Sequence, residues 1–268
     1  MSPALPPAPA PAATVLLVRG DPPGELFMVR RGKTAAFMAR AMVFPGGKVD
    51  AADAELAHRS DLAPTEAGER LGLEPTQALA FFVAAARETF EEAGVLLATR
   101  GGVPVELSKR LVEHRWALNE KRKSFNDILE AEDLVLTLSA LTPHAWWVTP
   151  TIEPRRFDTR FFMATLPPGQ VPIHDARETT AGEWLTPQAA LDGYAAGTLE
   201  LAPPTLRILL DLLENRPPSL DRIEPQAKLE GKEIHLLLPG DAEFAPPGPH
   251  HDRIVMRGGR WCVERPPI

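Results

Sequence analysis

Three glutamates stand close together in the middle of the chain, at positions 88, 91 and 92. In a helix this spacing places Glu88, Glu91 and Glu92 on one face within about one turn. Like charges so arranged repel each other by roughly a few tenths of a kcal/mol per pair, and a bound cation would relieve that repulsion. Because carboxylate oxygens are hard ligands, the pattern indicates Mg²⁺ or Mn²⁺. A solvated acidic helix face would show the same three residues.

The residues around these glutamates narrow the interpretation. Positions 87–95 read Arg-Glu-Thr-Phe-Glu-Glu-Ala-Gly-Val after Ala84-Ala85, and Phe44-Pro45-Gly46-Gly47 forms a glycine turn upstream. Together they resemble the Nudix box in its Arg-Glu, its Glu-Glu, its glycines and its apolar positions. The resemblance is highly specific for the Nudix hydrolase superfamily and extends over about residues 14–215.

The resemblance implies roles for the acidic helix. Glu91 and Glu92 would bind the metal, Glu88 would complete the site as ligand or base, and Arg87 would hold the carboxylates by pairing with them. Water would then attack one phosphorus of a diphosphate, with divalent cations neutralising its oxygens. A general base is needed, and the candidates are Glu88 and the downstream Glu178 and Glu183. The sequence leaves Glu88 and Glu178 equally open, whereas Glu183 fits better as a surface residue flanking a core tryptophan.

The spacing of this box departs from the usual pattern. Gly47 and Arg87 are separated by 39 residues, where the family has 13, so about 26 residues are inserted. Counting forward from Gly47, the position of the first glutamate falls on Asp53, whose role is open. We place the insertion at about 54–75, a polar stretch whose prolines and glycines are expected to break any regular element.

A box split at this place resembles one branch of the superfamily, the peroxisomal coenzyme A diphosphatases. The similar stretches are residues 44–53, 87–97 and 154–162. The resemblance implies hydrolysis of coenzyme A or acyl-coenzyme A to an adenosine bisphosphate and a phosphopantetheine product. One alternative is hydrolysis of another nucleotide derivative, such as ADP-ribose, a dinucleotide or a nucleotide sugar. A Nudix-fold binding module without catalysis is the other, although the intact acidic residues argue against it.

Basic residues and glycines suggest where a phosphorylated substrate would bind. The glycines allow the backbone to approach phosphate, and guanidinium groups suit phosphate oxygens. Solvated strand ends would carry the same basic residues, and of the adjacent Trp146 and Trp147 at least one is expected in the core. The candidates are Gly46 and Gly47, the basic string Arg30, Arg31, Lys33 and Arg40, and a second pair, Arg155 and Arg156.

The composition excludes several classes of protein. The formal charge of −7 and pI near 5.6 argue against a partner such as duplex nucleic acid. No apolar run approaches the roughly 20 residues of a membrane span, and a single cysteine allows no internal disulfide. We expect a cytoplasmic enzyme of a small nucleotide-type substrate, and family analogy suggests a homodimer.

The elements that must position the acidic residues are a strong helix and several short strands. The helix begins near Thr76 and ends at Gly94, which suits the left-handed residue after a helix. These patterns and the resemblance predict an α/β/α sandwich with a mixed sheet over residues 14–216. Residues 1–13 are expected as a disordered Pro/Ala-rich tail, and 217–268 as an extension with a small β structure. Strands are expected at 13–19, 25–30, 41–44, 95–97, 146–148, 157–166, 183–185, 234–238 and 254–263, and helical segments within 105–141, 187–196 and 204–214.

Overall fold

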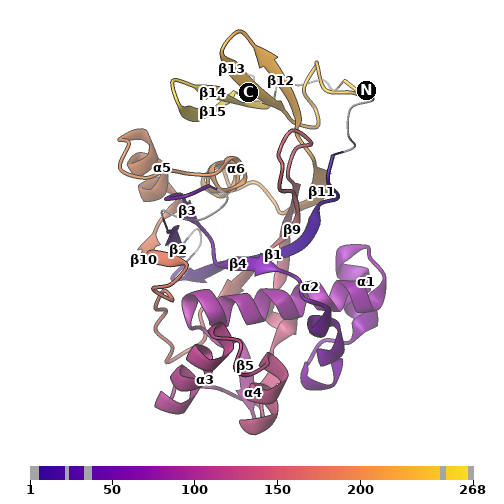
Figure 1. Cartoon of the computed structure of the whole chain (residues 1–268), viewed down its shortest axis with the longest axis vertical. Coiled ribbons are helices and arrows are strands. Elements are labelled where there is room, and N and C mark those ends of the chain that lie inside the picture. Colours follow the sequence, from indigo (N-terminus) through magenta and orange to yellow (C-terminus); the bar gives the residue numbers. More distant parts are fainter. Residues whose placement is uncertain (1–5, 22–23, 33–37, 248–251, 265–268) are drawn as a thin grey trace.

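A mixed sheet of eight strands forms the centre of the molecule (Figure 1). The computed structural model describes residues 6–21, 24–32, 38–247 and 252–264. The strand order is β10-β2-β1-β9-β8-β11, with β3 beside β2 and β4 beside β1. β1 runs parallel to β9, and β8 runs parallel to β11, whereas the remaining pairs are antiparallel. The strands are β1 (Ala10–Arg19), β2 (Glu25–Arg31), β3 (Met42–Val43), β4 (Gly46–Lys48), β8 (Thr142–Val148), β9 (Phe157–Thr165), β10 (Thr179–Leu185) and β11 (Ser219–Ile223).

Strand β1 explains how the sheet divides the core. Its side chains alternate between faces, so Val15 and Leu17 join one apolar cluster and Leu16 joins the other. All three are fully buried. A strand covered on both faces requires layers above and below it, which is the sandwich that the sequence predicts.

Helices cover both faces of the sheet, as Figure 1 shows. Helix α2 (Pro75–Glu88) crosses beneath β1 and β4 together with α1 (Pro64–Leu71), and α3 (Lys109–Asn119) and α4 (Phe125–Ala131) lie on the same side. Helices α5 (Pro187–Ala195) and α6 (Pro203–Leu213) cover the other face. The predicted α/β/α arrangement with a mixed sheet is therefore confirmed.

The inserted segment is more regular than the sequence suggested. The prediction that residues 54–75 break any regular element is wrong, because they hold most of a 3₁₀ segment, η1 (Ala51–Arg59), and the whole of α1. Pro64 stands in the first turn of α1, where its missing N–H is harmless. Gly72 ends the helix with φ of 64°. The glycine and proline that resembled loop residues are thus helix boundary residues.

Other boundaries also differ from the prediction, and the single strand expected at 254–263 is a hairpin of two strands, Arg253–Arg257 and Arg260–Glu264. Residues 10–12, expected only in the tail, belong to β1. Residues 95–97 form no strand, and strand pairing begins only at β5 (Ala98–Arg100), which has β6 (Val103–Pro104) and β7 (Val135–Leu136) beside it. Residues 219–223, expected in the extension, form β11 on the edge of the main sheet.

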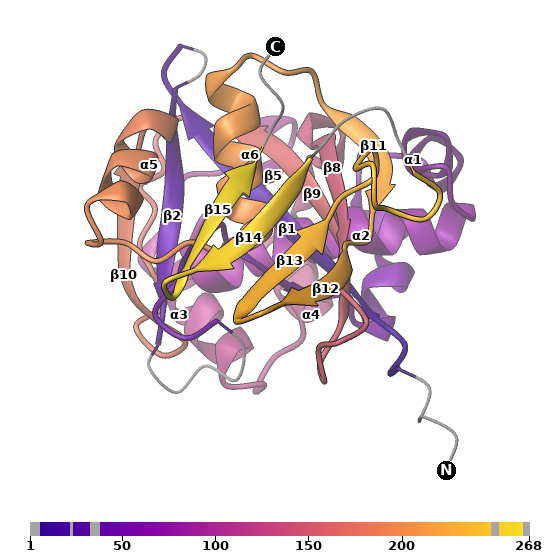
Figure 2. The same cartoon turned by 90° about the horizontal axis from the view of Figure 1, so that it is seen from above.

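The chain then forms a separate antiparallel sheet, which we call the C-terminal sheet. Its strands are β12 (Gln226–Glu230), β13 (Glu233–Leu237), β14 (Arg253–Arg257) and β15 (Arg260–Glu264), paired in that order. Figure 2 shows this sheet lying over α6 and β1, on the face opposite α2. Within the described segments, no helix is long and apolar enough to span a membrane.

Candidate active site

The glutamates lie where α2 changes its helical geometry. Residues 75–88 are α-helical, and Thr89–Ala93 continue as a π-turn, η2, that ends at Gly94 with φ of 67°. The sequence predicted an uninterrupted α-helix here, so the π-turn is a correction. The hydrogen bonds of a π-turn span five residues instead of the four of an α-helix, and such turns occur often at functional sites.

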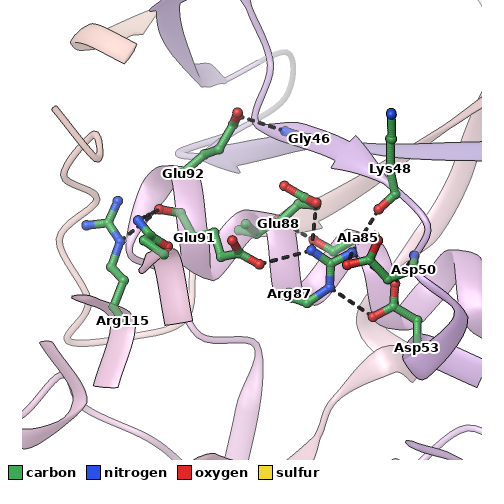
Figure 3. Close-up of polar contacts among 12 residues, drawn as sticks. Gly46, Lys48, Asp50, Asp53, Ala85, Arg87, Glu88, Glu91, Glu92 and Arg115 are labelled. Atoms are coloured by element: carbon green, nitrogen blue, oxygen red, sulfur yellow. Dashed lines mark hydrogen bonds and ion pairs between the residues drawn. The ribbon is translucent and has the colours of Figure 1, made fainter. Parts of the chain in front are cut away.

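Arg87 organises the acidic residues around it (Figure 3). Its Nη1 donates to Glu88 at 2.7 Å and to Glu91 at 2.9 Å. Its Nη2 also donates to the carbonyl of Lys48, at 2.8 Å, on strand β4. Burial acts to lower the pKa of Arg87, but the bond to Asp53 and the neighbouring carboxylates raise it above its usual value. Arg87 therefore stays charged.

Asp53 supplies the remaining partner of Arg87. Its two carboxylate oxygens accept from Nε and Nη2, each at 2.9 Å, and only 2 % of the residue is exposed. The same carboxylate accepts from the backbone N–H of Asp50, which fixes the start of η1. The residue whose role the sequence left open is thus the buried counter-ion of the arginine.

The glycine turn packs directly against the glutamates. The backbone N–H of Gly46 donates to Glu92 at 3.0 Å. A Cβ atom added at Gly47 would lie 2.5 Å from the carboxylate of Glu88, so only glycine fits without displacing that side chain. The sequence predicted that these glycines let the backbone approach a phosphate. In the structure, the groups packed against the two glycines are the carboxylates of Glu92 and Glu88.

Crowding of the carboxylates changes their acidity. Burial is the main cause that raises the pKa of Glu88, to about 7, with Arg87 opposing it. Burial and then the charge of Glu88 raise the pKa of Glu92 to about 8. Burial also raises the pKa of Glu91. Three carboxylates, those of Asp53, Glu88 and Glu91, share the single guanidinium of Arg87, so the site carries an excess of negative charge when they are ionised.

This excess of negative charge is the observation that fits a divalent cation. Among the described residues, no three acidic, histidine or cysteine side chains already converge as a metal site, since Arg87 holds Glu88 and Glu91 and the glycine turn holds Glu92. The donors are nevertheless oxygen atoms of the kind that Mg²⁺ or Mn²⁺ prefers.

Helix α3 secures the π-turn from outside, which the sequence did not indicate. Arg115 Nε and Asn119 Nδ2 both donate to the carbonyl of Glu91, at 3.0 and 3.3 Å. The guanidinium of Arg115 also lies where a side chain at Gly94 would stand. The sequence has no motif that identifies Arg115 and Asn119, because both bind a backbone carbonyl that is available to them only when the π-turn has formed.

The glutamates open onto one large cavity of about 1310 Å³. Of the other predicted site residues, Arg31, Glu178, Gly46 and Gly47 line this cavity. Arg31 keeps a buried Nε that has no hydrogen-bond partner in the described part of the chain. Trp147 is buried as expected and lines the cavity, whereas Trp146 packs against Arg160 with 3.4 Å from the guanidinium to the ring centre.

Two predicted substrate residues lie elsewhere. Arg156 is buried, bonds to Glu224 and donates to the carbonyls of Thr149 and Pro7. These contacts connect the residue that precedes β9 to neighbouring segments. Arg156 therefore makes structural contacts and does not line the cavity. Arg40 is exposed in a turn with φ of 67° and does not belong to the cavity wall. Lys33 lies outside the described residues.

Comparison with known proteins adds a second line of evidence. A family model described as the NUDT19 Nudix domain matches residues 75–212, just over half of the 268 residues. A protein named acyl-coenzyme A diphosphatase NUDT19 from Gallus gallus is 31 % identical over 307 positions, covering 90 % of this chain and 80 % of that protein.

The chain belongs to the Nudix hydrolase family.

Other relatives agree with the assignment. The chain also resembles acyl-coenzyme A diphosphatase NUDT19 from Xenopus laevis, at 27 % identity over 218 residues, and spans 57 % of that protein. The crystal structure of a Nudix hydrolase from Alicyclobacillus acidocaldarius superposes with a TM-score of 0.67 at 30 % identity, covering 78 % of this chain and 93 % of that one. The fold of this Nudix hydrolase is thus shared with a solved member of the family.

Proposed function

We propose that this Nudix hydrolase cleaves the phosphoanhydride bond of coenzyme A and acyl-coenzyme A, releasing an adenosine bisphosphate and a phosphopantetheine product. The observation that carries the proposal is Arg87, which holds Glu88 and Glu91 at the wall of one large cavity. The names of the relatives from Gallus gallus and Xenopus laevis support the choice of substrate.

In the proposed reaction, the oxygen of water forms a bond to one phosphorus while the bond from that phosphorus to the bridging oxygen breaks. The bridging oxygen leaves with the other phosphate, and the proton of the water passes to a carboxylate. Glu88, Glu91 and Glu92 are the residues that would hold a divalent cation, which when bound neutralises phosphate charge and activates water. Arg31, which lines the cavity, would pair with a phosphate oxygen through its guanidinium.

Glu88 and Glu178 are the candidates for the base. Glu88 is fixed by Arg87, whereas the described hydrogen bonds of Glu178 involve its backbone, with Asp175 and Gly32. Replacing each by glutamine and measuring kcat against pH separates the two. The variant that removes the base loses about 10²–10⁴-fold in rate and the acidic limb of the profile, and the other keeps that limb.

The first test is product analysis by mass spectrometry. The purified protein is incubated with Mg²⁺ and coenzyme A, acyl-coenzyme A, ADP-ribose, NADH or dinucleoside polyphosphates. Phosphopantetheine and adenosine bisphosphate from the first two would support the proposal. Turnover of the other compounds alone would contradict the choice of coenzyme A, and absence of turnover would favour a binding module. Homodimer formation and a cytoplasmic location stay predictions.

A further inference from the structure

The cavity has two chemically different ends. One end is lined by the glutamates and by Lys121 and Lys123, which follow α3 on the α2 side of the main sheet. The other end continues onto the opposite face of the sheet. There the lining includes the apolar side chains of Trp147, Phe161, Pro204, Ile234, Leu236 and Trp261, which we call the apolar chamber.

Two sheets build the walls of this chamber. Trp147 and Phe161 project from β8 and β9, and they share one hydrophobic cluster with Leu236 of β13. Ile234 of β13 and Trp261 of β15 pack against that cluster and remain partly exposed. The C-terminal sheet therefore covers part of the cavity in addition to packing on α6 (Figure 2).

Trp261 is held in place through its backbone. The hydroxyl of Tyr194 on α5 donates to the carbonyl of Trp261 at 2.8 Å and accepts from its N–H at 2.7 Å. These two bonds do not involve the indole ring. The ring can consequently be replaced without removing the bonds that join β15 to α5.

The volume of the cavity indicates a large ligand. Sites for small molecules commonly measure about 300–1,000 Å³, and this cavity of about 1310 Å³ exceeds that range. A ligand that fills it needs an anionic part, which would pair with Lys121, Lys123 and a cation held by the glutamates. It also needs an apolar part, whose surface is removed from water against the tryptophans. An acyl thioester of coenzyme A has both parts in one molecule.

We propose that the apolar chamber binds the acyl chain of the substrate and that Ile234 and Trp261 of the C-terminal sheet determine the preference for chain length. This inference rests on the proposed function, because it concerns the same cavity. It gives the C-terminal sheet a direct contact with substrate.

Kinetics with a series of acyl chains test the inference. Trp261→Ala and the milder Ile234→Ala are compared with wild type on coenzyme A, acetyl-, octanoyl- and palmitoyl-coenzyme A. We expect each to raise KM for palmitoyl-coenzyme A about tenfold, the cost of a lost apolar contact, with kcat and the KM for coenzyme A unchanged. Leu229→Asn is the matched control, because Leu229 lies on β12 of the same sheet but is 74 % exposed.

Photolabelling gives a readout that needs no turnover. An acyl-coenzyme A carrying a diazirine at the chain end is bound in the presence of EDTA, irradiated, and located by peptide mass spectrometry. Label on β13 or β15 supports the inference even if a variant folds poorly. Label only on elements that do not line the apolar chamber, absence of label, or variants whose KM changes equally for coenzyme A and palmitoyl-coenzyme A would overturn it. Failure of the proposed function would instead appear as wild-type protein that hydrolyses no coenzyme A compound.

Discussion

Arg87 and Asp53 form a buried two-point ion pair across 34 positions of the sequence, with both donor–acceptor distances at 2.9 Å. The pair joins α2 to the 3₁₀ segment that opens the insertion. Because Arg87 also holds Glu88 and Glu91, the position of the candidate metal ligands depends on a residue outside their helix.

Asp53→Asn is expected to lower both stability and activity. Breaking a buried pair leaves an uncompensated charge and costs about 3–5 kcal/mol. Loss of a residue that orients ligands lowers activity about 10–100-fold. Urea denaturation and steady-state kinetics measure the two effects. Asp133→Asn is the control, because Asp133 pairs with Arg59 while its side chain is 88 % exposed, and wild-type values are expected. An unaffected Asp53→Asn variant would show that the pair is dispensable.

Glu91→Gln is expected to abolish most turnover while the protein stays folded. The amide oxygen can still accept from Arg87, but the charge that would bind a cation is gone. We expect kcat to fall about 100-fold, or about 2.7 kcal/mol in activation free energy, with the melting temperature close to that of wild type. Glu120→Gln, at the exposed end of α3, is the control. Unchanged metal-dependent turnover in Glu91→Gln would falsify the assignment of this helix as the active site.

The metal-free protein is expected to lose stability as pH rises. The pKa values of Glu88 and Glu92 are raised from 4.5 to about 7 and about 8 in the fold. The folded state therefore binds more protons than the unfolded chain between these limits, so stability is full below pH 4.5 and falls as pH rises toward 8.

Thermal unfolding from pH 5 to 9 measures this effect, first in EDTA and then in Mg²⁺. We expect the melting temperature in EDTA to drop by several degrees over that range, and Mg²⁺ to restore it mainly at the alkaline end, because only ionised carboxylates bind the cation. Glu92→Gln should flatten the curve in EDTA. A flat wild-type curve would mean that these carboxylates ionise as easily in the folded protein as in the unfolded one.

The two glycines of the turn should respond differently to alanine. A Cβ at Gly46 would lie 2.5–2.7 Å from the backbone of Ala13 and Thr14 and from the Thr14 hydroxyl, which the sheet fixes. Gly46→Ala is expected to destabilise the fold by about 1–3 kcal/mol. At Gly47 the atoms met are those of the flexible Glu88 carboxylate, so Gly47→Ala should reduce turnover more than stability. Denaturation and kinetics on both variants test the contrast, which equal stability losses would contradict.

Much of the fold follows from local sequence patterns. Strands and helices were predicted wherever apolar residues alternate or recur at helical spacing, as in β1, β9 and α6. The inserted segment was misread because Pro64 and Gly72 serve equally as breakers and as helix boundaries. Only the packing of Ala67 and Leu71 into the core, against α2, distinguishes the two cases.

The candidate site was predictable for residues close in sequence and less so for the others. Glu88, Glu91 and Glu92 share one short segment, and their spacing was enough to group them. The role of Asp53 was left open because the insertion separates it from Arg87 in the sequence. Arg31 reaches the cavity but Arg156 does not, although both are arginines near a strand end, because the direction of a long side chain depends on tertiary contacts.

The π-turn at Thr89–Ala93 has a consequence for insertions and deletions in this helix. Its hydrogen bonds span one residue more than those of an α-turn. Deleting Thr89 or Phe90 would allow regular α-helical pairing, yet Glu91 and Glu92 would then follow Glu88 by two and three positions instead of three and four. Residues two apart do not share a helix face. A shorter helix is therefore expected to be more regular and yet inactive, so the chemistry of the site constrains the length of this turn.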